Sequence, residues 1–366
     1  MFITVDVIAS RFGTLLAGMH IIAIALIGAF ALRGAIRVRP LQLIWFLVLS
    51  LVLIIGALFG IRAFYTHVFV APFTKGDVLA GLTLLGDPQP HRVYRDAAEV
   101  PPTPAAGTDA LVRIRETGLL RACYRRSDYP SSFFNYDGEL VGFDIEMAHR
   151  FARQLDAGLQ FVPVESIRDA EKRIDSGDCD IFMSLMPIAP EMTLRFGMTA
   201  QVLESVVGLI VEDHRRRQFQ TWDSIRRLGP IRIATSGNPV TRGFLLQTLP
   251  KAMPVVFKDN AELDHLSQEN PLQADALLMP AEEGAAWTIR YPRFNLVTPF
   301  PIRWASFGYV ARLGDERLLT FFNAWLVNAR GDGTISALYR HWMLGEIGTS
   351  RPPRWSIARD VLGWFD

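Results

Sequence analysis

Two long uncharged stretches stand near the beginning of the chain, at residues 12–32 and 40–61. A helix of about 20 apolar residues crosses the hydrocarbon core of a bilayer, so both stretches are predicted as transmembrane helices. A buried hairpin of a soluble domain is the alternative. Three arginines, Arg33, Arg37 and Arg39, lie in the short segment between the stretches. Because short arginine-rich loops stay in the cytoplasm, both ends of the hairpin are expected outside it.

The pattern changes after the hairpin. Residues 65–85 mix aromatic and polar positions, so they complete a membrane region that extends over residues 1–85. Residues 86–107 contain five prolines and predict an extended linker. At the other end, the Trp-containing tail at residues 346–366 is expected to form a short amphipathic helix at its apolar positions.

Between the linker and the tail, strand-like and helix-like patterns alternate. Short apolar runs predict strands at residues 119–124, 159–164 and 180–184. Apolar positions at helical spacing predict one helix that begins with Asp144 as its cap and a second over residues 167–174 that stops at Gly177. Two such strand–helix–strand units with short connections predict a parallel sheet with helices on its faces.

A second alternating set follows. It predicts a helix at residues 240–249, two C-terminal helices striped by Leu318, Phe322 and Trp342, and strands at 231–235, 254–257, 274–279, 295–298 and 306–311. The fold class is therefore α/β, with two lobes rather than one long sheet, preceded by two transmembrane helices.

Composition removes several function classes. The formal net charge of +1 argues against nucleic-acid binding, and 24 Phe with 8 Trp argue against disorder. Only Cys123 and Cys179 occur, so a disulfide scaffold and a thiolate zinc site are excluded; the pair either forms one disulfide or packs as free thiols. The seven histidines are scattered, and neither a phosphate-binding loop nor a nucleophile elbow is present. No catalytic residue, metal or cofactor is expected.

Three segments together resemble the extracellular solute-binding proteins of family 3. They are DGELVGFDIEMA at residues 137–148, IDSGDCDIFMS at 174–184 and FGYVARLGDERLLTFFNAWLVNARGDGTISALYRHW at 307–342. The resemblance covers about residues 110–345 and implies a Venus flytrap fold, in which two hinged lobes close on a small polar solute. It places the solute-binding domain at residues 108–345, with lobe 1 at 108–203 and 307–345 and lobe 2 at 204–305.

The resemblance also implies where lobe 1 contacts the solute. Relatives place an aromatic directly after the proline of the first turn, where this chain has Ser131, so Tyr129 or Phe134 is expected to replace it unless both only pack in the core. Asp128 and the strand-end residue Ser184 complete the candidate set. The relatives' threonine and carboxylate-clamping arginine correspond here to Ala189 and Met192, which argues against an ordinary α-amino acid as solute.

In lobe 2, Ser236 and Asn238 precede a helix, and Asn238 is expected as either helix cap or solute contact. The aspartate with which relatives bind an amino group falls on Pro280. Glu282 is the preferred replacement, with a solvated surface glutamate as the alternative. Arg303, near the return to lobe 1, is a candidate anion partner.

The leading functional hypothesis is a receptor of the bacterial inner membrane, with its solute-binding domain on the periplasmic side, that feeds a membrane transporter. Its predicted partners are a small solute, amino-acid-like or carboxylate, a transporter component and the lipid bilayer. One alternative is a prephenate-type dehydratase on the same fold, with Glu282 or Asp128 as general acid; another is a ligand sensor. The first residues also resemble the last membrane segment of dicarboxylate/cation symporters, so the chain is alternatively the C-terminal part of such a fusion.

Overall fold

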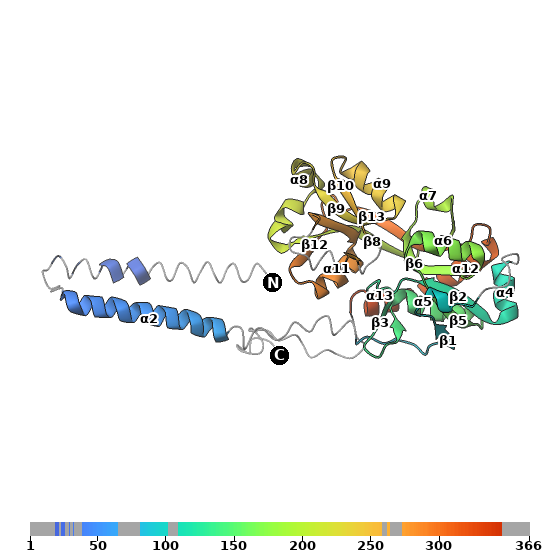
Figure 1. The fold of residues 1–366 in the computed structure, drawn as a ribbon, viewed down its shortest axis with the longest axis horizontal. Coiled ribbons are helices and arrows are strands. Elements are labelled where there is room, and N and C mark those ends of the chain that lie inside the picture. Colours follow the sequence, from blue (N-terminus) through green and yellow to red (C-terminus); the bar gives the residue numbers. More distant parts are fainter. Residues whose placement is uncertain are drawn as a thin grey trace. The chain divides into compact units, whose positions relative to one another are not determined.

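The computed structural model describes residues 39–64, 81–101, 109–257 and 273–345, together with short pieces at 19–21, 23–25, 29, 32 and 262–263. The chain divides into two compact units, residues 1–73 and 74–366, and each is described by itself. Figure 1 shows the elements of both units in sequence colours.

The first unit contains the helix α2 (Pro40–Phe64), at the place of the predicted second membrane helix. Its apolar side chains are exposed, Trp45 and Phe46 among them. Among the described residues it is the one helix whose stretch Pro40–Gly60 is long and apolar enough to cross a membrane. The predicted span at residues 12–32 lies largely outside the described residues. The pieces of it that are described at 19–21 and 23–25 are helical.

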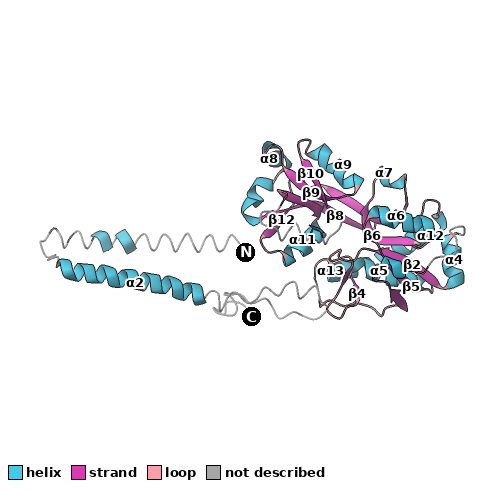
Figure 2. Ribbon diagram, viewed as in Figure 1, coloured by secondary structure: helices cyan, strands magenta, loops and turns pink. Residues whose placement is uncertain are grey.

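The second unit consists of two α/β lobes joined by two crossing strands (Figure 2). Strands follow one another in the order β1-β5-β2-β6-β13-β8-β11-β9-β10, with β12 paired to β8 and β7 to β13. In lobe 1 they are β1 (His91–Val93), β2 (Leu119–Tyr124), β5 (Gly158–Pro163), β6 (Ile181–Pro187) and β7 (Gly197–Met198). In lobe 2 they are β9 (Arg232–Ser236), β10 (Met253–Phe257), β11 (Ala276–Pro280) and β12 (Phe294–Val297).

The lobes are connected through β8 (Leu203–Glu212) and β13 (Trp304–Ala311). Residues 203–206 of β8 pair antiparallel with residues 304–307 of β13. Beyond this crossing, β8 continues along β11 and β12 of lobe 2, and β13 continues along β6 of lobe 1. Two paired strands therefore form the hinge. The sequence analysis predicted β13, but it placed no strand at β8.

Both faces of the lobe 1 sheet are covered because its strands are apolar on both sides. One face packs against α4 (Ala110–Thr117), α5 (Phe143–Gln154), α12 (Glu316–Gly331) and α13 (Thr334–Trp342). The other face packs against α6 (Ile167–Ser176) and α7 (Pro190–Thr193). Lobe 2 repeats the arrangement, with α8 (Trp222–Arg227) and α9 (Pro239–Thr248) on one face and α11 (Ala281–Arg290) on the other. The 3₁₀ helix η3 (Asp213–Phe219) precedes α8.

Part of the segment predicted as an extended linker belongs to lobe 1. Its strand β1 pairs in parallel with β5, and the side chain of Leu82, just before this segment, is buried in the core. Glu146 of α5, which is 2% exposed, accepts hydrogen bonds from the backbone amides of Leu85 and Gly86, both at 3.1 Å. The linker prediction is therefore wrong for residues 86–93. The frequency of prolines does not reveal that the backbone after them pairs with an edge strand of the sheet.

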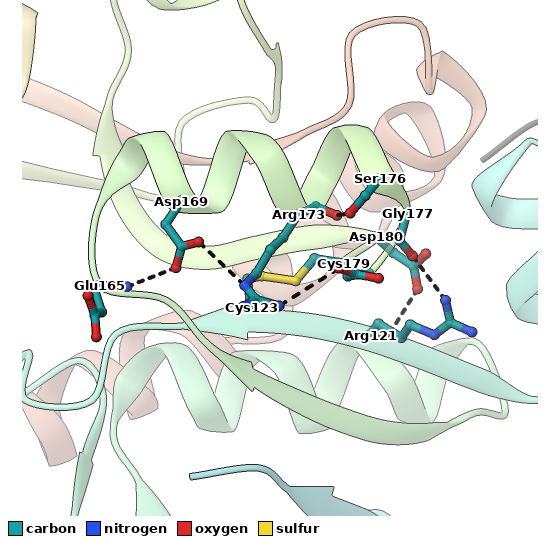
Figure 3. Close-up of a disulfide and its surroundings, with 10 residues drawn as sticks. Arg121, Cys123, Glu165, Asp169, Arg173, Ser176, Gly177, Cys179 and Asp180 are labelled. Carbon is teal, nitrogen blue, oxygen red and sulfur yellow. Dashed lines mark hydrogen bonds and ion pairs between the residues drawn. A yellow bond between two sulfur atoms is a disulfide. The ribbon is translucent and has the colours of Figure 1, made fainter. Parts of the chain in front are cut away.

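Cys123 and Cys179 form a disulfide, which decides between the two alternatives that the sequence left open (Figure 3). Cys123 lies in β2, and Cys179 lies in the turn that connects α6 to β6. Both are buried among the apolar side chains beneath α6. Next to the disulfide, the backbone amide of Arg121 donates to the carboxylate of Asp180 at 2.8 Å, and Arg113 forms an ion pair with the same carboxylate. These contacts tie the α6–β6 turn to β2.

Candidate functional site

The loop that follows β2 is held over the beginning of α5. The backbone amides of Phe143 and Asp144 donate hydrogen bonds to the carbonyls of Pro130 and Ser131, at 3.2 and 2.9 Å. These amides are available because the first turn of a helix has no internal partners for them. Gly142, which precedes the helix, has φ +131°, and a Cβ there would lie 2.3 Å from the carbonyl oxygen of Ser131. Only glycine fits this close approach, so the motif around Gly142 positions the loop.

A charged cluster joins this loop, which follows the carboxyl end of β2, to Ser184 in the neighbouring strand β6. The Arg125 guanidinium forms an ion pair with Asp128 at 2.7 Å, and its Nε donates to the hydroxyl of Ser184 at 2.9 Å. Ser184 in turn donates to Asp128 at 3.2 Å. The side chains of Asp128 and Ser184 are almost completely buried, whereas that of Arg125 is 30% exposed. Ligands in open α/β sheets bind at this strand edge, so the predicted residues Asp128 and Ser184 lie where a ligand contact is expected.

Asp144 lies next to this cluster and does not cap its helix. The residue before α5 is Gly142, and the Asp144 side chain points inward instead. It accepts hydrogen bonds from the hydroxyl of Tyr309 at 2.7 Å and from the backbone amide of Leu185 at 3.3 Å. Burial raises the pKa of Asp144 well above its ordinary value, and the pKa of Tyr309 is raised by the same cause and by the neighbouring carboxyl. The predicted cap is therefore wrong, because the Asp144 carboxyl group is buried against the sheet and makes its hydrogen bonds to Tyr309 and Leu185.

Lobe 2 brings a carboxyl group to the same cluster from the first turn of α11. Glu283 is half-buried, and its carboxyl group makes a hydrogen bond with that of Asp128. Burial is the main cause that raises the pKa of Glu283 to about 8, and the charges of Asp128 and Asp144 raise it further, while Arg125 opposes them. Two carboxyls in contact cannot both ionise easily, so this pair holds a proton at neutral pH.

Glu282, the predicted cation-binding residue, faces another direction. One of its carboxylate oxygens accepts a hydrogen bond from the Tyr339 hydroxyl of α13 at 2.8 Å, and the other accepts from the hydroxyl of Ser205 in β8. The residue therefore links lobe 2 to lobe 1 beside the hinge. The structure brings its neighbour Glu283, rather than Glu282, to Asp128. Sequence reasoning could not separate two adjacent carboxylates, because the exact start of the helix decides which one faces the cleft.

The two aromatics predicted to pack on a solute have different surroundings. Tyr129 stacks on Phe133 with 4.5 Å between ring centroids, and the guanidinium of Arg290 from lobe 2 lies over the Tyr129 ring at 4.9 Å. Phe134 packs against the lobe 1 core, as Tyr129 also does, and the guanidinium of Arg95 lies over the Phe134 ring at 4.3 Å. Tyr129 thus lies between the lobes, and Phe134 does not.

A small cavity of about 20 Å³ lies between the lobes in the described part of the chain. This volume holds about one water molecule. Residues of both lobes line it: Ser127, Tyr129, Leu263, Met279, Glu283, Trp287 and Arg290. The two lobes are therefore closed on each other, through Glu283 with Asp128, Glu282 with Tyr339 and Arg290 with Tyr129.

The remaining predicted residues lie outside this cavity. Asn238 caps α9, because its side-chain oxygen accepts from the amide of Val240 at 2.9 Å. Ser236 is the last residue of β9, and Arg303 has an exposed side chain just before β13. At the position of the relatives' clamping arginine, Met192 is 1% exposed and packs with the apolar side chains beneath α6.

Arg125 and Arg290 are two charged residues that the sequence analysis did not name as candidates. Arg125 follows the first strand directly, and the rule that ligands bind at strand ends would have included it. Arg290 lies at the last turn of α11, far along the chain from Tyr129, and no local signal in the sequence connects the two.

Comparison with known proteins gives the following matches. The family description "Bacterial extracellular solute-binding proteins, family 3" matches residues 120–345. Cyclohexadienyl dehydratase of Pseudomonas aeruginosa is 28% identical over 238 residues, which are 64% of this chain and 85% of that protein. Membrane-bound lytic murein transglycosylase F of Stutzerimonas stutzeri is 24% identical over 252 residues, which are 65% of this chain and 50% of that protein.

Among solved structures, an ancestral amino acid-binding protein described as a precursor of cyclohexadienyl dehydratase is similar with a TM-score of 0.57 and 25% identity. The similarity covers 64% of this chain and all of that one. These matches confirm the predicted two-lobed α/β solute-binding fold.

Proposed function

Because this chain belongs to the bacterial extracellular solute-binding proteins, family 3, we propose that it is a receptor that captures a small polar solute for a membrane transporter. The observation that carries the proposal is the convergence of charged groups from both lobes, Arg125 and Asp128 from lobe 1 and Glu283 from lobe 2. Hinged closure of two lobes around a ligand is the mechanism of periplasmic binding proteins. The solute is amino-acid-like or a carboxylate.

The proposed location is the periplasmic side of the bacterial inner membrane. The exposed apolar helix α2 supports membrane anchoring, and a relative is membrane-bound by its name. The disulfide between Cys123 and Cys179 supports an oxidising compartment, where such bonds persist. Two membrane helices at residues 12–32 and 40–61 with both ends outside complete the proposed topology. The first residues resemble a symporter segment, so we also propose that the chain is the receptor end of a larger transporter.

The solute is best sought by native mass spectrometry of the full chain released from detergent. A bound small molecule should appear as a defined mass increase, and its addition should raise the melting temperature. A hundredfold excess over Kd stabilises by about 2.7 kcal/mol. Asp128→Asn should abolish the shift, and Asp137→Asn, an exposed change just beyond the same loop, should leave it intact. No mass increase, and no shift with any amino acid, carboxylate or amine, would refute the receptor.

The proposed topology has a direct test, because both native cysteines are in the disulfide and no native thiol competes. A cysteine placed at Gly107 should react with a membrane-impermeant thiol reagent in intact cells, whereas one placed at Gly34 should not. Reaction at Gly34 alone would reverse the proposed orientation.

An enzyme on the same fold is the second candidate, favoured by one observation. Glu283 carries a proton at neutral pH in a small, mostly enclosed cavity, which is the condition for a general acid. The 28% identity to cyclohexadienyl dehydratase supports the same candidate. The test is ultraviolet absorbance during incubation with prephenate, because an aromatic ring forms when the ring hydroxyl leaves as water and the ring carboxyl group leaves as carbon dioxide. Turnover that Glu283→Gln abolishes and Glu282→Gln keeps would favour the enzyme over the receptor.

A further inference from the structure

The carboxyl pair of Asp128 and Glu283 joins opposite lobes. Asp128 is fixed in lobe 1 by Arg125 at 2.7 Å and by Ser184 at 3.2 Å, and its backbone amide donates to Ser132 at 2.8 Å. Glu283 is fixed in lobe 2 by its place in the first turn of α11. Any opening of the cleft about the β8–β13 hinge separates these two carboxyls.

The charged surroundings of Glu283 come from four elements. The loop after β2 brings Arg125 and Asp128, and α5 brings Asp144, which Tyr309 of β13 holds. On α11 itself, Arg290 lines the same cavity, while Glu282 is bound to Tyr339 and Ser205. Around the deep end of the cleft, the guanidinium of Arg125 therefore meets three carboxyl groups, and Arg290 lies on the same cavity as Glu283. Asp128 and Glu283 are in contact, and two carboxyl groups in contact cannot both ionise easily, so closure favours one proton on this pair.

We propose that Asp128 and Glu283 form a proton-operated latch, in which one shared proton holds the two lobes closed. The proposal rests on the proposed function, since it concerns regulation of the same cleft. When the cleft opens, water reaches both groups and Glu283 ionises as an ordinary glutamate. The closed form therefore binds one proton more than the open form.

The direction of the pH dependence follows from this proton. In the closed form the pKa of Glu283 is raised to about 8 from 4.5, mainly by burial. Closure is therefore fully favoured below the pKa that Glu283 has in the open form. It weakens as the pH rises toward the pKa that Glu283 has in the closed form. Between about pH 5 and 8, the ratio of open to closed molecules increases up to tenfold per pH unit, and above that range it is constant.

The latch is tested on the full chain in lipid nanodiscs, without any solute. Spin labels on cysteines that replace the exposed residues Asp175 of α6 and Gln247 of α9 report the distance between the lobes. In the otherwise native chain, the long-distance population should grow between pH 5 and 8. Glu283→Gln, which keeps a neutral side chain of the same size, should stay closed at every pH. Asp137→Asn, an exposed change just beyond the same loop, is the control and should keep the pH response.

Three results would overturn the latch. One is an interlobe distance that does not change with pH in the native sequence. Another is a Glu283→Gln variant that is open at every pH, because this result would mean that an ionised Glu283 closes the cleft by pairing with Arg125. The third is a pH response lost equally in Asp137→Asn. No ligand enters the experiment, so failure to find a solute would refute the receptor and leave this result standing.

Discussion

Glu146 is predicted to be the main attachment of the segment before β1 to lobe 1. Its carboxylate accepts four hydrogen bonds while 2% of the residue is exposed. One oxygen accepts from the backbone amide of Leu85 at 3.1 Å and from the indole of Trp342 at 2.9 Å. The other accepts from the amide of Gly86 at 3.1 Å and from Arg150 at 2.9 Å. A single side chain thus joins the N-terminal segment, α5 and α13.

Glu146→Gln tests this attachment with almost no change in volume. The new amide nitrogen would face two donors, so two hydrogen bonds to a charged acceptor are lost, each worth about 1.5–3 kcal/mol. The other two remain but become bonds to a neutral acceptor. Breaking one side of a buried charged network costs about 3–5 kcal/mol, and we expect a loss of this size in the free energy of unfolding.

The assay is urea denaturation of the full chain in detergent, together with hydrogen exchange at the amides of Leu85 and Gly86. Exchange at these amides should accelerate more than at those of β2. Glu116→Gln, on the exposed side of α4, is the control and should stay within about 0.5 kcal/mol of the native chain. A loss below about 1 kcal/mol for Glu146→Gln, with unchanged exchange, would refute the attachment.

Three further outcomes are expected. Replacing Cys123 and Cys179 by serine opens a loop with a sequence separation of 56 and should cost about 4 kcal/mol in urea denaturation, the same loss that reductant should cause in the native chain. Gly142→Ala should lower the melting temperature strongly, because its Cβ would meet the Ser131 carbonyl at 2.3 Å; a neutral effect would contradict this geometry. Burial lowers the pKa of His149 to about 3 from 6.5, so stability should fall by up to about 1.4 kcal/mol per pH unit as the pH drops below 6.5, and His149→Gln should remove this slope.

Elements with strong periodicity could be predicted from the sequence nearly to the residue. The strand at 119–124 and the helix end at Gly177, which has φ +82°, lie where the pattern placed them. These elements carry their own signals, an apolar run or a left-handed glycine. The hinge strand β8 was not predicted, although it is ten residues long. Its burial varies along its length because it passes from one lobe to the other, so no single period describes it.

The site was less predictable because its geometry depends on contacts between distant segments. Asp128 and Ser184 could be found, since Asp128 lies in the loop that follows β2 and Ser184 lies in the neighbouring strand β6. The choice between Glu282 and Glu283 depends on the rotation of α11, which its packing through Trp287 against the lobe 2 sheet decides. The contact of Arg290 with Tyr129 forms only when the lobes are closed. The sequence around either residue has no pattern that predicts this contact.

Compared with the pattern of family 3, this cleft keeps charged groups on both lobes but has them at different positions. The resemblance to family 3 implies a cation on lobe 1 at Met192 and a carboxylate on lobe 2 at Pro280, and this chain has neither. Arg125 returns a guanidinium to lobe 1, and Glu283 returns a carboxyl group to lobe 2, three residues after Pro280. Since the two now meet around Asp128, the charges that relatives direct at a solute are here directed partly at each other. In the receptor that we propose, a solute competes with these contacts between the lobes, and the proposed latch ties its capture to the proton on Glu283.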